Sequence, residues 1–173
     1  MIVLITGGSG SGKSEFAENY LKKINNGKEC CYLATMMPRD DAETKERIAR
    51  HRQMRKEKGF YTVEQALDIE ECVDAIKPGS GILLEDLSNL AANEMFREDG
   101  NVMDYQKIMD GIQDLSNTSE NLVIVSNNIF EDGIEYDQGT KEYMRLLARL
   151  NESLAVICDE VYEVVVGIPV RVK

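Results

Sequence analysis

Residues 7–14 read Gly7-Gly8-Ser9-Gly10-Ser11-Gly12-Lys13-Ser14, and this stretch decides the fold. It matches the phosphate-loop pattern G-x-x-x-x-G-K-[ST], and it lies between an apolar run at 2–5, typical of a strand, and a helical pattern at 15–21. Backbone N–H groups of such a loop wrap a phosphate, and the helix N-terminus adds partial positive charge. The pattern predicts that Lys13 reaches the β and γ phosphates of a nucleotide and that Ser14 binds Mg²⁺. A Gly/Ser-rich turn with a chance lysine is the alternative, and the strand–loop–helix context disfavours it.

Composition favours one acidic domain that spans residues 1–173. The net charge of −11 argues against general binding of nucleic acid, which needs a basic surface. No apolar run approaches the about 20 residues needed to cross a bilayer, and the first strand begins too early to leave room for a signal peptide. The four cysteines lack zinc-ligand spacing, and we expect them to be reduced and structural in a cytoplasmic protein: Cys30, Cys31, Cys72 and Cys158.

The pattern of apolar runs predicts an α/β fold like that of the phosphate-loop NTPases. Short apolar runs separated by helical segments are typical of a mostly parallel sheet flanked by helices. We expect strands at 2–6, 30–35, 81–85, 122–126, 161–166 and 169–172. We expect helices at about 13–24, 40–57, 68–76, 87–97, 103–116 and 139–156. Gly167-Ile168-Pro169 predicts a short hairpin-like end between the last two strands, and ligands of such sheets bind at the carboxyl ends of the strands.

A second half of a nucleotide site is indicated by residues 81–86, GILLED, an apolar strand that ends in acid. A carboxylate at this place in a phosphate-loop protein faces the loop and holds Mg²⁺. Since side chains alternate along a strand, Glu85 and Asp86 cannot both point into the site. The alternative is a buried strand with a solvated acidic end. The presence of a phosphate-loop motif in the same chain disfavours this alternative.

A basic segment, KERIARHRQMRKEK at 45–58, contains His51, the one histidine of the chain. At helical spacing Arg47, His51 and Arg55 share a face. A solvated basic helix is one interpretation of this segment. The other is a phosphate-binding face, in which the histidine attacks phosphorus and forms a phosphoramidate while the arginines neutralise charge. The local sequence leaves both interpretations open.

These motifs together resemble one enzyme family over essentially the whole chain. The shared stretches are ITGGSGSGKS (5–14), YLAT (32–35), RIARHR (47–52), TVE (62–64), ILLE (82–85), VIVSN (123–127) and LNESLAVICDEVYEVVVGIPVRVK (150–173). The chain resembles the bifunctional adenosylcobinamide kinases / adenosylcobinamide-phosphate guanylyltransferases of cobalamin biosynthesis. It departs from the family at Asn127-Asn128, where members often carry Asn-Glu.

The resemblance implies two reactions on adenosylcobinamide, with ATP and GTP as substrates and Mg²⁺ as cofactor. A nucleoside triphosphate phosphorylates the aminopropanol hydroxyl, and GTP then donates GMP to that phosphate. The resemblance implies that His51 is catalytic and carries GMP covalently. The phosphate-loop and GILLED motifs assign catalysis also to Lys13, and the metal to Ser14 and Glu85. The implied nucleotide contacts are Gly7, Gly8, Ser9, Gly10, Ser11, Gly12, Lys13, Ser14, Thr35, Met36, Met37, Arg52, Gln53, Met54, Arg55, Glu64 and Glu85. It also implies a homo-oligomer, a trimer of single-domain subunits.

A simple phosphate-loop kinase of another small alcohol, with a structural His51, is the alternative function. A regulatory GTPase is disfavoured, because the sequence contains neither the NKxD guanine motif nor a DxxG switch.

Overall fold

The computed structural model describes residues 1–37, 55–97, 105–130, 133 and 135–173. Within these residues one seven-stranded sheet has the order β3-β2-β4-β5-β1-β6-β7. Its strands are β1 (Ile2–Thr6), β2 (Cys30–Ala34), β3 (Phe60–Glu64), β4 (Gly81–Glu85), β5 (Leu122–Val125), β6 (Glu160–Val165) and β7 (Ile168–Arg171). Neighbours pair in parallel from β3 to β6, and β7 returns antiparallel along β6. The predicted parallel sheet with a hairpin-like end is confirmed.

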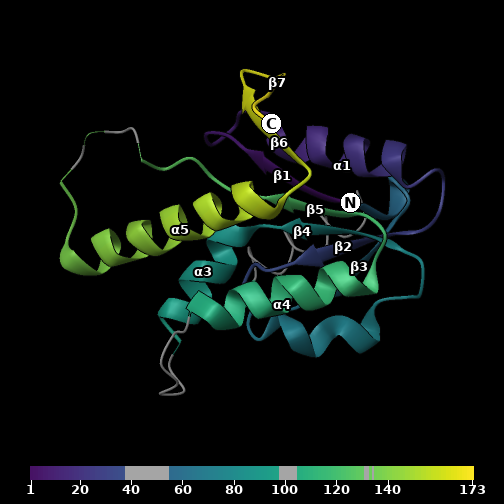
Figure 1. Ribbon diagram of the computed structural model, residues 1–173, viewed down its shortest axis with the longest axis horizontal. Helices are drawn as coiled ribbons and strands as arrows, with labels where there is room; N and C mark the ends of the chain where they lie inside the picture. Colours follow the sequence, from purple (N-terminus) through teal and green to yellow (C-terminus); the bar gives the residue numbers. More distant parts are fainter. Residues whose placement is uncertain (38–54, 98–104, 131–132, 134) are drawn as a thin grey trace.

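Helices cover both faces of the sheet (Figure 1). They are α1 (Lys13–Ile24), α3 (Leu87–Met95), α4 (Tyr105–Thr118), α5 (Gln138–Ile157) and the 3₁₀ helix η1 (Ile69–Ala75). Alternation in β2 shows why both faces are apolar. Leu33 belongs to a core cluster with η1, α3, α4 and α5, whereas Tyr32 and Ala34 pack with α1 on the other face. The sheet therefore buries two cores, and α1 with the phosphate loop lies over only one of them.

The structure bears on two expectations from composition, the state of the cysteines and the lack of a segment that could cross a bilayer. The four cysteines are free and buried, as predicted. No helix in the described ranges is long and apolar enough to span a bilayer.

The sequence-based expectation differs from the structure in the segment between β2 and β4. It missed β3, because FYTVE is not a continuous apolar run: β3 is an edge strand, and Phe60 is its one buried residue. The helix expected at 68–76 is a 3₁₀ helix over Ile69–Ala75. Of the helix expected at 40–57, only residues 55–57 lie in the described part, and they are helical.

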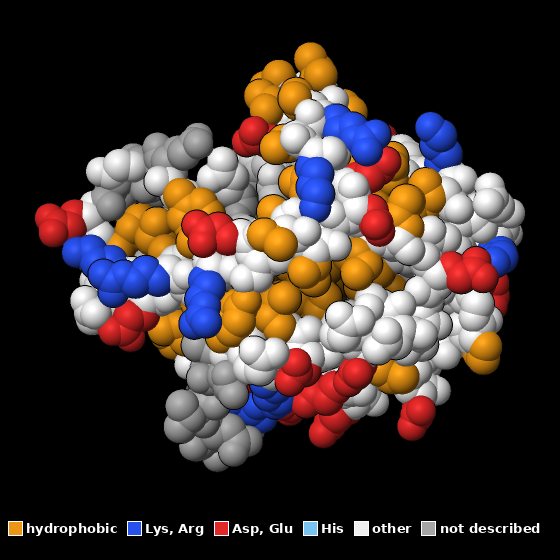
Figure 2. Space-filling view, viewed as in Figure 1, with side chains coloured by type: hydrophobic (Ala, Val, Ile, Leu, Met, Phe, Trp, Pro, Cys, Tyr) orange, Lys and Arg blue, Asp and Glu red, His pale blue; other side chains and the backbone are white. Residues whose placement is uncertain are grey.

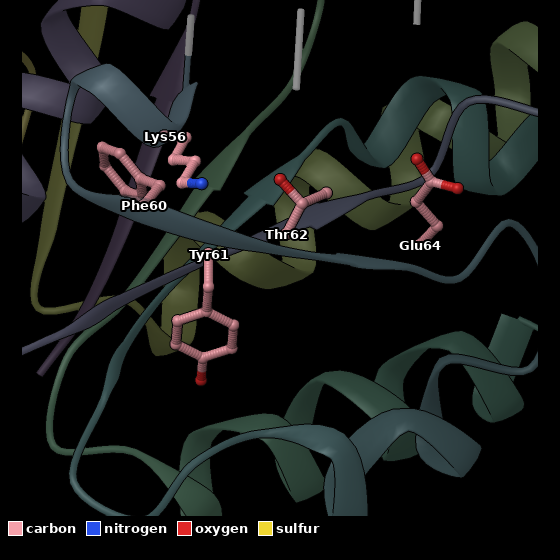
Figure 3. A pocket seen from close by; sticks show the side chains of 5 residues that line it. All are labelled: Lys56, Phe60, Tyr61, Thr62 and Glu64. Atoms are coloured by element: carbon pink, nitrogen blue, oxygen red, sulfur yellow. The ribbon is translucent and has the colours of Figure 1, made fainter. Parts of the chain in front are cut away.

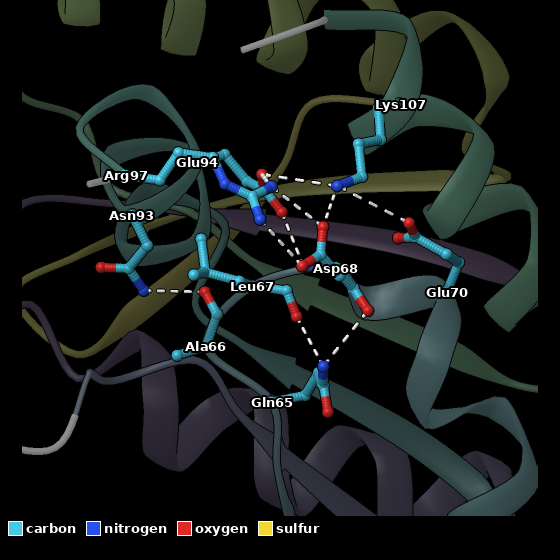
Figure 4. A network of polar contacts seen from close by, with 9 residues as sticks. All are labelled: Gln65, Ala66, Leu67, Asp68, Glu70, Asn93, Glu94, Arg97 and Lys107. Carbon is cyan, nitrogen blue, oxygen red and sulfur yellow. Dashed lines mark hydrogen bonds and ion pairs between the residues drawn. The ribbon is translucent and has the colours of Figure 1, made fainter. Parts of the chain in front are cut away.

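A network of ionic side chains fixes the turn that follows β3 against α3 and α4 (Figure 4). The Arg97 guanidinium, 6% exposed, donates to Asp68 at 3.0 Å and to Glu94 at 2.9 Å. The Lys107 ammonium, 34% exposed, binds the Asp68 carboxylate from α4. Removal of this buried guanidinium takes the nearest cation from the buried Glu94 carboxylate, whereas Asp68 keeps its contact with Lys107.

We therefore predict that Arg97→Ala lowers the free energy of unfolding by about 3 kcal/mol, because it removes the nearest cation from the buried Glu94 carboxylate. Lys28→Ala is the control, since Lys28 forms a solvent-exposed pair with Glu120, and it should cost less than about 1 kcal/mol. Urea denaturation of the three proteins measures the difference. Equal losses for the two variants would contradict a structural role for the network.

Candidate functional site

The phosphate loop joins the end of β1 to the start of α1 and closes on itself. The Lys13 ammonium donates to the carbonyl oxygen of Gly8 at 3.1 Å, and the lysine is buried. Gly7 lies so close to the end of β6 that an added Cβ would be 2.6 Å from the Val164 carbonyl oxygen. The loop thus packs without room for a side chain at Gly7, and its lysine is already held within it.

Ser14, at the first turn of α1, connects the loop to the acidic end of β4. Its hydroxyl donates to Oε1 of Glu85 at 2.6 Å. The other oxygen, Oε2, is buried and has no hydrogen-bond partner in the described part of the chain. Burial raises the pKa of the Glu85 carboxyl to about 7, the Asp86 charge adds to this rise, and Ser14 and Lys13 oppose it.

Asp86 makes contacts away from the phosphate loop, and these decide which of the two acids of the GILLED stretch faces the loop. It is the N-cap of α3, where its Oδ1 accepts from the Asn89 N–H at 2.7 Å. Its Oδ2 accepts from the side-chain amide of Asn127 at 3.3 Å. The structure therefore turns Glu85, and not Asp86, toward the phosphate loop.

The Ser14–Glu85 pair fits a magnesium ion chemically. Mg²⁺ prefers oxygen ligands, and it is usually held by one or two carboxylates together with substrate phosphates. The buried Oε2 of Glu85, without a partner among the described residues, is the group that such an ion would satisfy. Ser14 and Glu85 are thus the residues of this site that could hold the metal.

Thr35 lies beside Glu85 at the carboxyl end of β2, and its side chain is buried. Its N–H donates to the Glu85 carbonyl oxygen at 3.1 Å, and its hydroxyl both accepts from the Asp86 N–H and donates to the Asp86 carbonyl oxygen, each at 2.8 Å. Asn93 of α3 binds the Thr35 carbonyl oxygen at 2.7 Å. Thr35 therefore fixes the backbone at the end of β4, while Met36 and Met37 that follow it are each 43% exposed.

The end of the basic segment is attached to the α1 face of the sheet. The Arg55 guanidinium carbon lies 3.8 Å from the centroid of the Tyr32 ring, a cation–π contact. The Lys58 ammonium binds the carboxylate of Glu18 on α1. Glu18 is buried and stands one helical turn after Ser14. Sequence reasoning missed Glu18, although the spacing of four from Ser14 could have placed both on one face of the helix.

Glu64 lies at the same carboxyl edge of the sheet. In the register Ala34 pairs with Glu64 on one side and with Glu85 on the other, so two strand spacings of about 4.8 Å separate the acids. Glu64 is exposed beside a hollow of about 490 Å³ along β3 (Figure 3). That hollow is also lined by Lys56, Phe60, Tyr61 and Thr62.

Four of the predicted site residues, His51, Arg52, Gln53 and Met54, lie outside the described residues. The structure brings together the phosphate loop, Glu85 and Thr35, and it places Arg55 on the same face as α1.

Comparison with known proteins decides the family. The family model described as cobinamide kinase / cobinamide phosphate guanyltransferase matches residues 3–172. The chain belongs to this family. The bifunctional adenosylcobalamin biosynthesis protein CobU of Escherichia coli (strain K12) is 31% identical over an alignment of 186 positions, gaps included, which covers 100% of both chains. The protein of the same name from Salmonella typhimurium (strain LT2) is 30% identical over the full length of both.

The fold is also similar to a solved structure outside the family. This structure, an ATPase domain, superposes with a TM-score of 0.50 and 14% sequence identity, over 94% of this chain and 68% of that one. This likeness supports the fold alone, and with it the predicted phosphate-loop NTPase architecture.

The raised pKa of Glu85 predicts how stability changes with pH. Between the ordinary value of 4.5 and about 7, the folded chain keeps a proton that the unfolded chain has lost, so the free energy of unfolding falls as the pH rises through this window. The side chain at this position does not titrate in Glu85→Gln, so the free energy of unfolding of this variant should fall less over the same pH window. Urea midpoints at about pH 5 and about pH 8 measure the slope.

Glu120→Gln is the control for this experiment, because Lys28 lowers the pKa of that exposed carboxyl. The free energy of unfolding of Glu120→Gln should fall with rising pH by as much as that of the wild type. A Glu85→Gln slope equal to that of the wild type would contradict a raised pKa of the Glu85 carboxyl.

Proposed function

We propose that this chain phosphorylates adenosylcobinamide with a nucleoside triphosphate and then transfers GMP from GTP to the product through His51. Membership of the cobinamide kinase / guanyltransferase family supports the two reactions. The observation that carries the proposal is the contact of Ser14 with Glu85 next to the buried Lys13, an arrangement that suits a polyphosphate with its metal ion.

In the first reaction the substrate hydroxyl oxygen bonds to the γ phosphorus. The bond from this phosphorus to the β–γ bridging oxygen breaks, the nucleoside diphosphate leaves, and the hydroxyl proton passes to solvent. Lys13 and the loop N–H groups stabilise the charge on the transferring phosphate. Mg²⁺, when bound, neutralises charge on the β and γ phosphates.

In the second reaction a ring nitrogen of His51 bonds to the α phosphorus of GTP, and the bond to the α–β bridging oxygen breaks to release pyrophosphate. A phosphate oxygen of adenosylcobinamide phosphate then displaces the nitrogen and regenerates the histidine. His51 lies close to Arg55 along the sequence. Arg55 packs on Tyr32, on the α1 face of the sheet. This attachment supports a position of the basic segment near the phosphate loop.

Arg55 and Arg52 are proposed to bind the phosphates that the histidine attacks. The side chains or backbone of Thr35, Met36, Met37, Gln53, Met54 and Glu64 complete the proposed nucleotide contacts.

Incubation with GTP and Mg²⁺ should therefore add one GMP to the intact chain, with the adduct on the peptide that contains His51. His51→Ala should give no adduct, because the nucleophilic nitrogen is absent. Lys13→Ala should slow both reactions by about a hundredfold or more, since the phosphates lose their charge partner. Intact-mass measurement and a cobinamide phosphorylation assay follow the two steps.

Lys23→Ala is the matched control, because Lys23 is an exposed lysine of the same helix α1, and it should behave as the wild type. An adduct that persists in His51→Ala would contradict the nucleophile. A wild type that forms no adduct and does not phosphorylate cobinamide would favour the alternative, a single-activity phosphate-loop kinase of another small alcohol with a structural His51.

We also propose that the chain, as one domain, works as a homo-oligomer in the cytoplasm, as a trimer in line with the family resemblance. Apolar side chains gather on the exposed end of β6 and β7 (Figure 2): Val165, Val166, Ile168, Val170 and Val172. Because β7 is an edge strand, this surface could pair with another copy. Light scattering measures the mass of the assembly, and a monomer mass would overturn this proposal.

A further inference from the structure

The turn between β6 and β7 reaches the outside of the phosphate loop. The Gly167 N–H donates to the Ser11 carbonyl oxygen at 2.8 Å. The Cα of Gly167 lies 3.4 Å from the place where a Cβ on Gly12 would stand. The C-terminal hairpin, which has no role in the chemistry described above, thus touches the middle of the nucleotide-binding loop.

This contact has a consequence for the direction of a loop N–H group. The carbonyl of Ser11 and the N–H of Gly12 belong to one planar trans peptide, so they point in opposite directions. Because Gly167 holds the Ser11 carbonyl toward the hairpin, the Gly12 N–H points away from the hairpin, to the inner side of the loop. A phosphate bound in the loop needs N–H groups with this orientation.

The turn itself has positive φ angles, which residues other than glycine seldom adopt. Val166 has φ 44° and Gly167 has φ 83°, the two left-handed positions of a two-residue hairpin turn. A β-branched residue at positive φ is an outlier that persists where the surroundings enforce it. Val166 is 85% exposed, so burial of its side chain does not compensate for this conformation. The strands on either side and the bond to Ser11 hold the turn in place.

We propose that the β6–β7 turn orients the phosphate loop, and that Gly167 is the positioning residue that sets the Gly12 N–H toward the nucleotide phosphates. This role rests on the proposed nucleotide site, and it deepens that site by adding a residue from the far end of the chain. It does not depend on the guanylyl chemistry, because it concerns nucleotide binding alone.

The test compares alanine at two glycines with the same backbone. Gly167→Ala meets open space, as does Gly79→Ala, and the two glycines have φ 83° and φ 77°. Both variants carry the same left-handed strain, but only Gly167 touches the phosphate loop. Gly167→Ala should weaken the affinity for Mg-GTP by about tenfold, as expected for a lost or misdirected bond to a charged phosphate, and Gly79→Ala should leave it unchanged.

Gly167→Asn is the conservative variant, because asparagine tolerates the left-handed region, and it should recover most of the affinity. Isothermal titration with Mg-GTP, in the absence of cobinamide, measures all four proteins below their unfolding temperatures. In the transfer of GMP, the KM for GTP should rise in Gly167→Ala, while the rate of transfer at saturating GTP stays near that of the wild type.

Wild-type affinity in a folded Gly167→Ala would overturn the proposal, as would equal losses in Gly167→Ala and Gly79→Ala. If the wild type itself does not bind Mg-GTP, the proposed nucleotide site fails. If it binds Mg-GTP but forms no adduct on His51, only the guanylyl chemistry fails and the comparison of glycines stands.

Discussion

The hydrogen bond from Ser14 to Glu85 is the contact on which the proposed site depends, because it joins two separate parts of the sheet. Ser14 lies in the first turn of α1, after the phosphate loop that follows β1, whereas Glu85 ends β4, and β5 lies between β1 and β4. One oxygen of Glu85 is bonded and the other is buried without a partner in the described residues. A carboxyl in this state has a raised pKa and gains from a cation. The contact thus fits the proposed site for metal-bound phosphate.

The surrounding structure keeps this contact in place from several directions. Thr35 holds the backbone at the end of β4, and Asp86 caps α3 so that only Glu85 faces the loop. On the opposite side the loop rests on β6 and on the β6–β7 turn. Since a phosphate loop works through the direction of its N–H groups, these backbone supports matter as much as the charged side chains.

Sequence alone predicted the parts of this site that depend on local pattern. The phosphate loop and the apolar strand with a terminal acid have fixed spacings, and both were confirmed as structural elements. The choice between Glu85 and Asp86 depends on a cap and on an amide from Asn127, which lies 41 residues away, so periodicity could not decide it. Edge strand β3 was missed because its residues FYTVE are mostly half-exposed and do not form the continuous apolar run that marks the central strands. The ion pair of Glu18 with Lys58 and the contact of Gly167 with Ser11 are tertiary, and no local pattern indicates them.

The central claim is that Glu85 and Ser14 bind the metal that accompanies the nucleotide. Calorimetric titration of GTP into the wild type and Glu85→Gln, each with Mg²⁺ and with EDTA, tests this most directly. The account predicts that Mg²⁺ strengthens GTP binding to the wild type and has little effect on Glu85→Gln, while the two proteins bind metal-free GTP equally. Equal losses of affinity with and without Mg²⁺ in Glu85→Gln would contradict the claim.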